Sequence, residues 1–350
     1  MIQTLAVYVH RLDPFALGPF GGFGIRWYGL SYLAGFIVGF LVIRAFARRG
    51  LSPLKPELAG DFIMSAAIGT IVGGRAGYCL FYQPALLTDF SSSFPYWGLL
   101  AINNGGMASH GGMIGLVLSC IWFARKHRLP SLHLMDLIGL TAPIGVFFGR
   151  LANFVNGELL GRPCQAGFAW AVKFPQELLD WGRNHPAFAS RDFQEVVEMA
   201  NAANANAGIE VAPSLIDQVV TAVRHDDAVA QALSPFLVSR HPSQLYEAVL
   251  EGLVVFACLL WIWRRPRKPG LITAWFFLIY GVCRILGEQF RMPDAHIGYE
   301  WLGLTRGQWL SFGLLAFGAF GLFKWSRRSA DLLGGWAQKK GARESAPVHK

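Results

Sequence analysis

The chain has 350 residues, of which 53% are hydrophobic and only 15% are charged. This balance is typical of a multi-pass membrane protein and excludes an ordinary soluble domain. The formal net charge is +9, but the Lys and Arg residues are grouped beside apolar segments, so they indicate membrane topology rather than nucleic-acid binding. The five cysteines have no Cys-x-x-Cys spacing, which argues against a disulfide framework or a zinc site.

Seven apolar segments predict an all-α polytopic membrane protein with seven transmembrane helices. They lie at about 25–46, 61–82, 107–123, 135–155, 245–263, 271–290 and 309–325. The first segment is followed by six more, so we expect no cleaved signal peptide. Glycines at four-residue spacing in the second, third and fourth segments predict that these helices pack closely.

Lys and Arg residues follow the first, third, fifth and seventh segments, whereas the loop 83–100 has none. Because cytoplasmic loops are enriched in Lys and Arg, the N-terminus is predicted to be periplasmic and the C-terminus cytoplasmic. The predicted parts are a periplasmic surface arm (1–24), helices 1–4 (25–155), a periplasmic head insertion (156–240), helices 5–7 (241–325) and a basic cytoplasmic tail (326–350). The Asn/Ala-rich residues 201–208 predict a flexible part of the head.

Three arginines fall at one predicted depth in the membrane. Arg75, Arg150 and Arg284 each follow the cytoplasmic start of an outward-running helix by 14 residues. At 1.5 Å per residue they lie roughly 21 Å into a hydrocarbon core about 30 Å thick. Tyr28 and His110 begin inward-running helices, so they are predicted to lie in the same outer layer.

These intramembrane arginines predict an anion site. Each costs about 2.5–3.5 kcal/mol on insertion scales, so the three require partners. Glu288, four residues after Arg284, can offset only part of their charge, and a substrate anion is expected to complete the balance. Guanidinium forks suit phosphate oxygens. In the alternative interpretation, Arg75 and Arg284 reach outer headgroups or pair with carboxylates for structural reasons.

Residues 149–163 close the fourth apolar segment with an unusual number of polar groups. Arg150, Asn153 and Gly157 share one helical face, which indicates a site for a planar, lipid-borne anion. In the third segment His110 lies among small residues. Its imidazole is suited to accept a proton near neutral pH, unless a backbone carbonyl satisfies it.

Two further motifs have local interpretations. Before the fifth segment, Ser243, Gln244 and Glu247 are interpreted as a helix cap. Tyr28, beside Trp27, belongs to an aromatic belt or hydrogen-bonds a substrate. There is no phosphate loop, Gly-x-Ser-x-Gly sequence or metal-ligand spacing, so neither a metal nor another cofactor is predicted.

Together these motifs resemble bacterial phosphatidylglycerol–prolipoprotein diacylglyceryl transferases over about residues 20–325. The resemblance is carried by Gly-Gly-Arg-Ala-Gly-Tyr at 73–78, His-Gly-Gly-Met-Ile-Gly at 110–115, Gly-Arg-Leu-Ala-Asn-Phe-Val-Asn-Gly-Glu at 149–158 and His-Pro-Ser-Gln-Leu-Tyr-Glu at 241–247. It implies an enzyme of the bacterial cytoplasmic (inner) membrane, active towards the periplasm. Such enzymes transfer the diacylglyceryl group of phosphatidylglycerol to the lipobox cysteine thiol in the signal peptide of a preprolipoprotein, giving a thioether and glycerol 1-phosphate. Residues 184–238 are longer than usual for the family.

The resemblance also implies roles for individual residues. Arg150 would bind the lipid phosphate, and Arg284 would be the second essential arginine. The expected catalytic residues are His110, Arg150, Arg284, Tyr28 and Glu288, and the expected substrate-binding residues are Arg150, Asn153, Asn156, Glu158, Gly161, Arg75 and Arg284. His110 is the first candidate for the base that deprotonates the thiol, with Tyr28 or Glu288 as alternatives.

Two other classes of protein fit the sequence less well. A transporter or channel that binds an anion in transit would need polar inner halves of its helices. Here residues 36–43, 116–123 and 254–262 are almost wholly apolar. A structural or assembly protein would leave the layer of arginines without a role.

Overall fold

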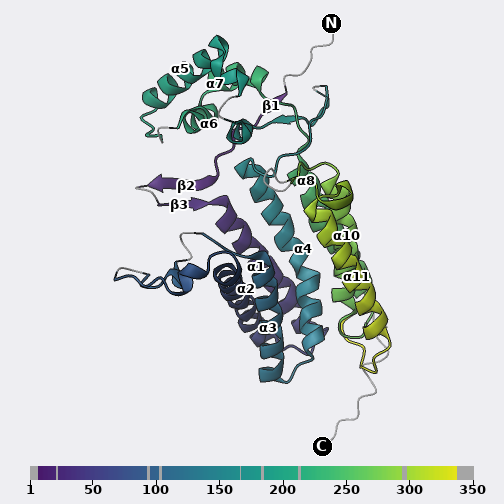
Figure 1. The fold of residues 1–350 in the computed structure, drawn as a ribbon. Coiled ribbons are helices and arrows are strands. Elements are labelled where there is room, and N and C mark those ends of the chain that lie inside the picture. Colours follow the sequence, from purple (N-terminus) through teal and green to yellow (C-terminus); the bar gives the residue numbers. More distant parts are fainter. Residues whose placement is uncertain are drawn as a thin grey trace, which may run out of the picture. The chain divides into compact units, whose positions relative to one another are not determined.

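The structure, a computed structural model, describes most of the chain, from residue 7 to residue 336 with short gaps. The described residues are 7–20, 23–92, 95–101, 105–165, 167–182, 185–211, 214–293 and 298–336. Parts of the predicted arm and tail, residues 1–6, 21–22 and 337–350, lie outside them. The described chain is mostly helical, with small strands (Figure 1).

Long helices account for most of the fold. They are α1 (Trp27–Arg48), α2 (Ala59–Phe81), α3 (Ser109–His127), α4 (Ser131–Asn156), α10 (Leu271–Glu288), α11 (Arg306–Ser326), and a composite of α8 (Ser243–Glu247), the π-helix η8 (Ala248–Val254) and α9 (Val255–Trp263). Shorter helices are α5 (Arg191–Asn206), α6 (Leu215–His225) and α7 (Asp227–Leu233). The 3-10 helices are η1 (Pro56–Leu58), η2 (Pro84–Leu87), η3 (Gly98–Leu100), η5 (Pro175–Asp180), η6 (Pro186–Ala189), η7 (Ser234–Phe236) and η9 (Trp301–Gly303).

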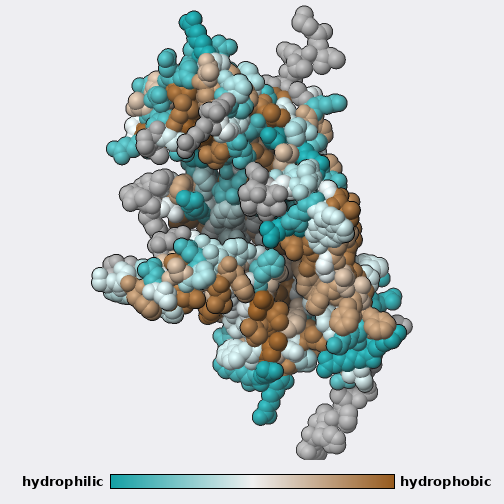
Figure 2. All heavy atoms as spheres, viewed as in Figure 1, coloured by the Kyte–Doolittle hydropathy of each residue, from teal (hydrophilic) through white to brown (hydrophobic). Residues whose placement is uncertain are grey.

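Five of the described helices are long and apolar enough to cross a membrane. They span Trp27–Arg48, Pro56–Phe81, Ser131–Asn156, Ser243–Trp263 and Leu271–Glu288. Figure 2 shows hydrophobic side chains, in brown, at the surface of long helices, as expected where lipid replaces water. The prediction of a helical membrane protein is therefore confirmed. The count of seven spans, which adds α3 and α11, stays a prediction, and so does the orientation.

The chain divides into two compact units. Unit 1 contains Met1–Gly35, Pro143–Val255 and Ile279–Leu315. Unit 2 contains Phe36–Ala142, Phe256–Leu278 and Ala316–Lys350.

In unit 1, helices α5, α6 and α7 pack around a small hydrophobic core (Figure 1). Phe193, Val219, Val223 and Leu233 are fully buried there. Helix α5 continues through Asn206, so the prediction of a flexible segment is wrong for residues 201–206. The physical reason is a tertiary contact, because the buried Asn204 side chain donates to the Gln218 carbonyl at 2.9 Å.

Two small sheets complete unit 1. Strand β1 (Tyr8–Val9) pairs in parallel with β4 (Val172–Lys173), which ties the N-terminal arm to the chain that follows α4. Strands β2 (Phe15–Phe20) and β3 (Phe23–Arg26) pair antiparallel directly before α1. The arm is therefore ordered by backbone hydrogen bonds over its described residues.

In unit 2, α2 and α3 approach at their glycines, as the four-residue spacing predicts. A Cβ atom on Gly77 would lie 2.9 Å from the Cα of Gly111. Farther along the pair, a Cβ on Gly115 would collide with the carbonyl oxygen of Gly69. Hydrogen atoms in place of side chains let the two backbones touch.

A buried carboxylate caps α10 in the same unit. Asp136 of α4 is 2% exposed and accepts hydrogen bonds from the backbone nitrogens of Gly270 (2.7 Å) and Thr273 (2.8 Å). It also accepts one from the Thr273 hydroxyl at 2.8 Å. Donors at a helix N-terminus lack partners inside the helix, so the negative charge is favourable there.

Candidate active site

Four side chains from three helical segments of unit 1 form a closed ring of ion pairs. Arg150 of α4 contacts Glu247 (Nη1–Oε2, 3.0 Å) and Glu251 (Nη2–Oε2, 2.9 Å). Arg284 of α10 contacts the other oxygens of the same carboxylates, Glu251 Oε1 at 2.9 Å and Glu247 Oε1 at 3.3 Å. Each arginine thus bridges both glutamates, and we call these four residues the arginine–glutamate ring.

The local sequence explains why both carboxylates face the arginines. Glu247 and Glu251 are four residues apart, so they share one helical face. The chain changes there from α8 to the π-helix η8, a rare geometry that occurs often at functional sites. Gly287 of α10 leaves the space, since a Cβ atom on it would lie 3.2 Å from Glu247 Cγ. The Tyr280 hydroxyl donates to Glu251 at 3.3 Å.

Two further residues extend the ring. Glu288 accepts a hydrogen bond from Arg284 Nη2 at 2.7 Å and one from the Thr305 hydroxyl at 3.1 Å. Arg291 Nη1 lies 3.9 Å from carboxylate oxygens of both Glu247 and Glu288. Three arginines thus face three glutamates, and their formal charges cancel.

This balance corrects two expectations. A substrate anion is not needed to neutralise Arg150 and Arg284, because the chain itself supplies two carboxylates that are 0% exposed. The interpretation of Ser243, Gln244 and Glu247 as a cap is also wrong. Ser243 Oγ donates to the Leu159 carbonyl at 3.2 Å, Gln244 Nε2 donates to the Glu158 carbonyl at 2.5 Å, and Glu247 joins the ring.

A second polar group in unit 1 surrounds Glu158. Its Oε1 accepts hydrogen bonds from the Tyr28 hydroxyl, from Asn153 Nδ2 at 3.0 Å and from Asn156 Nδ2 at 3.4 Å. Asn153 Nδ2 also donates to the Tyr28 hydroxyl. Gly157 has a positive φ of 67°, which ends α4 and turns Glu158 back towards Asn153. We call these residues the Glu158 cluster.

Gly161 connects this turn to the segments that carry the ring. It forms a β-bridge with Arg291, and the adjacent Arg162 nitrogen donates to the Phe290 carbonyl at 2.8 Å. A Cβ atom on Gly161 would collide with the carbonyl oxygen of His241. Only glycine allows the backbone to pass this closely.

Arg75, in unit 2, donates hydrogen bonds to backbone carbonyls outside its own helix. Its Nε donates to the Leu99 carbonyl at 2.9 Å, and Nη2 donates to the Gly98 carbonyl at 2.6 Å. Nη1 donates to the carbonyls of Gly105 (2.6 Å) and Gly106 (3.0 Å). Arg75 is 4% exposed, and its guanidinium is held by these backbone carbonyls.

His110 also belongs to unit 2. It is exposed in the first turn of α3, next to Gly111, where α3 meets α2. The ring and the Glu158 cluster belong to unit 1, so the part of His110 in the site stays a prediction.

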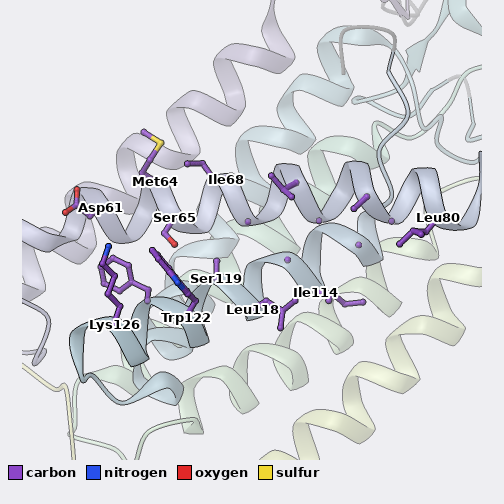
Figure 3. Close-up of a pocket in the computed structure, with 18 of the residues that line it drawn as sticks. Asp61, Met64, Ser65, Ile68, Leu80, Ile114, Leu118, Ser119, Trp122 and Lys126 are labelled. Carbon is purple, nitrogen blue, oxygen red and sulfur yellow. The ribbon is translucent and has the colours of Figure 1, made fainter. Parts of the chain in front are cut away.

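An apolar groove of about 860 Å³ runs along α2 and α3 in unit 2. Figure 3 shows residues that line it, among them Ile68 and Leu80 on α2 and Ile114 and Leu118 on α3. Asp61 and Lys126 lie at one end (Figure 3). A surface of this composition suits hydrocarbon rather than phosphate, so we assign the chemistry to the ring.

Sequence reasoning missed Glu251 and the role of Glu247. The signal was available, because two carboxylates four residues apart inside the apolar segment 245–263 require partners. Arg284 and Glu288 show the same spacing. Among the residues that the structure describes, no group of three His, Cys, Asp or Glu side chains could hold a metal ion.

The chain is similar to known proteins over nearly its whole length. The family model described as prolipoprotein diacylglyceryl transferase matches residues 14–324. The chain is 48% identical over 341 residues to the phosphatidylglycerol–prolipoprotein diacylglyceryl transferase of Bdellovibrio bacteriovorus, which covers 94% of this chain and 97% of that protein. The proteins of the same name from Azospirillum brasilense (36% over 334 residues, 94% and 100% covered) and Bradyrhizobium diazoefficiens (33% over 338 residues, 94% and 97% covered) are also similar.

Proposed function

Because the chain belongs to the prolipoprotein diacylglyceryl transferase family, we propose that the arginine–glutamate ring and the Glu158 cluster form its active site. The enzyme transfers the diacylglyceryl group of phosphatidylglycerol to a prolipoprotein, a step of lipoprotein maturation. The main observation in support of this site is that Arg150 and Arg284 share the same two carboxylate partners. The side chain of each arginine is 14% exposed.

In this proposal Arg150 and Arg284 bind the phosphodiester of phosphatidylglycerol. Guanidinium groups match phosphate oxygens in geometry and charge. The thiolate of the lipobox cysteine, in the signal peptide, attacks the glycerol carbon that bears the phosphate. As the carbon–oxygen bond breaks, negative charge develops on the leaving phosphate, where the preorganised arginines stabilise it. The products are a thioether and glycerol 1-phosphate.

His110 is our proposed base for the substrate thiol. Glu288 is less suitable, because one of its oxygens accepts from Arg284 and the other accepts from Thr305. Tyr28 remains the alternative, with its hydroxyl directed to Glu158. Either group would take the thiol proton and so produce the reactive thiolate.

Asn153, Asn156, Glu158 and Gly161 are proposed to contact substrate or to shape its site. The Glu158 cluster supports these roles, because amide, carboxylate and phenol groups meet there. Arg75 is proposed to act from a distance, by holding residues 98–99 and 105–106.

We also propose that the enzyme crosses the bacterial inner membrane seven times with its site towards the periplasm. The distribution of Lys and Arg between the loops supports a periplasmic N-terminus and a cytoplasmic C-terminus. The arm (1–24), head (156–240) and tail (326–350) are then the parts outside the membrane.

A transfer assay tests this proposal. Purified enzyme is mixed with phosphatidylglycerol and a lipobox peptide, and mass spectrometry follows the diacylglyceryl peptide and glycerol phosphate. Arg150→Ala should lower the rate by about 10²–10³-fold, the usual effect of removing one preorganised donor. Arg191→Ala, at an exposed helix in the head, should retain full activity. A peptide with serine in place of cysteine should give no product.

An undiminished rate in Arg150→Ala, with the fold intact, would contradict the site. Absence of product with the unaltered enzyme and both substrates would contradict the function itself.

A further inference from the structure

The arginine–glutamate ring is closed by side chains of the chain itself. Arg150 and Arg284 each contact both Glu247 and Glu251, and the glutamates are 0% exposed. With Arg291 and Glu288 included, the formal charge of the group is zero. The guanidiniums that are proposed to bind phosphate therefore belong to a group with no net formal charge.

We propose that Glu251 limits how strongly these arginines hold phosphate, and so allows the glycerol 1-phosphate product to leave. Glu251 is the residue to which the geometry points, because it lies 2.9 Å from a nitrogen of each arginine. Glu247 is 3.0 Å from Arg150 and 3.3 Å from Arg284. Glu288 contacts Arg284 at 2.7 Å and Arg291 only at 3.9 Å. Glu251 is thus a positioning residue that acts through the arginines.

The chemistry of the transfer explains the need for such a limit. The thiol proton goes to the base, the carbon–sulfur bond forms, and the electron pair of the broken carbon–oxygen bond goes to the phosphate oxygen. A phosphodiester with one negative charge thereby becomes a monoester with about −1.5 to −2 at neutral pH. If Arg150 and Arg284 had no carboxylate partners, they would bind this product more tightly than the substrate, and turnover would stop at release.

The inference rests on the proposed function, and it opposes a purely structural role for Glu251. If Glu251 only held the arginines in place, its loss would loosen them and weaken phosphate binding. If it limits their charge, its loss should strengthen phosphate binding. The two roles predict changes of opposite sign.

The experiment compares Glu251→Gln with the unaltered enzyme in the transfer assay. Glutamine keeps the shape of the side chain and can still accept from Tyr280. The inhibition constant of glycerol 1-phosphate should fall about tenfold, equivalent to about 1.4 kcal/mol of tighter binding. The kcat should also fall, with a burst of one thioether product per enzyme before slow turnover.

Glu177→Gln is the matched control. Glu177 is also buried and paired with an arginine, since its Oε2 lies 2.8 Å from Arg240 Nε, but it is outside the ring. The inhibition constant should be unchanged in this variant. An unchanged or higher constant in Glu251→Gln overturns the inference, while transfer by the unaltered enzyme leaves the function intact.

A second measurement does not depend on a stable variant. The second pKa of a phosphate monoester is about 6, so raising the pH from 5 to 8 converts glycerol 1-phosphate from monoanion to dianion. For a charge-balanced site, the inhibition constant of the unaltered enzyme should change less than threefold. A fall of tenfold or more would show that the site favours the dianion, and would overturn the inference.

Discussion

Among single residues, His10 shows how burial sets the charge of a side chain outside the membrane-spanning helices. It is 1% exposed, with its ring 5.3 Å from that of Phe154 and 5.2 Å from that of Phe174. Burial, with a smaller contribution from repulsion by Arg224, lowers the pKa of His10 from 6.5 to about 4. The imidazole is therefore neutral in the folded protein at neutral pH.

This neutral histidine predicts acid sensitivity. Below pH 6.5 the unfolded chain takes up a proton that folded His10 does not, so stability falls as the pH decreases from about 6.5 to 4. The full effect is about 3 kcal/mol. Thermal unfolding in detergent between pH 4 and 7 should show a shallower pH dependence for His10→Gln. His225→Gln, at an exposed site, should behave like the unaltered protein, and equal pH slopes for all three would contradict the prediction.

Residue patterns predicted part of the local geometry around Arg150. Arg150 and Asn153 were expected on one helical face, and the structure shows both beside polar partners in unit 1. Glu251 was missed because its partner Arg150 lies 101 residues away in sequence. Glu247 was interpreted as part of a helix cap from its neighbours in sequence, and its long-range contact with Arg150 was therefore not predicted.

At the scale of elements, the contact between α2 and α3 depends on missing side chains. Gly115→Leu would force a side chain into the Gly69 carbonyl, so the helices would have to separate. Overpacking of this kind costs about 1–3 kcal/mol. The melting temperature in detergent should fall, and the yield of folded protein should fall with it.

Gly313→Leu is the control for this prediction. A Cβ atom on Gly313 of α11 meets nothing within 4 Å, so leucine is accommodated. Equal melting temperatures for the two variants would show that the close approach contributes nothing to stability.

Apolar segments predicted the helices, because length and hydropathy are local properties of a sequence. They could not predict the π-helix Ala248–Val254, which inserts an unusual turn into an otherwise regular apolar run. Nor did they predict the α5 residues 201–206, where Asn204 is held by a tertiary hydrogen bond. In α5 a contact with another helix overrides the local composition.

For the whole molecule, orientation in the membrane can be tested with the native cysteines. Cys164 is half-buried in the predicted periplasmic head, whereas Cys79, Cys120 and Cys283 are buried in helices. A membrane-impermeant maleimide should label Cys164 in intact spheroplasts. Burial raises the pKa of Cys164, so labelling should be faster at pH 8.5 than at pH 7.

Arg327→Cys in a Cys164→Ser background gives the complementary measurement. The new cysteine follows α11, on the predicted cytoplasmic side, and should react only after lysis. Labelling of this cysteine in intact spheroplasts would reverse the predicted orientation.

The carboxylate of Asp136 has a consequence for how the protein is made. Its partners Gly270 and Thr273 are synthesised 134 and 137 residues later. At a translation rate of about 5–20 residues per second, that interval lasts about 7–27 s. Throughout it, α4 contains an acidic side chain near its start, and such a side chain costs up to about 2.5–3.5 kcal/mol, the value for the centre of a membrane helix. The insertion machinery must therefore shelter α4, or leave its end in contact with water, until α10 emerges from the ribosome.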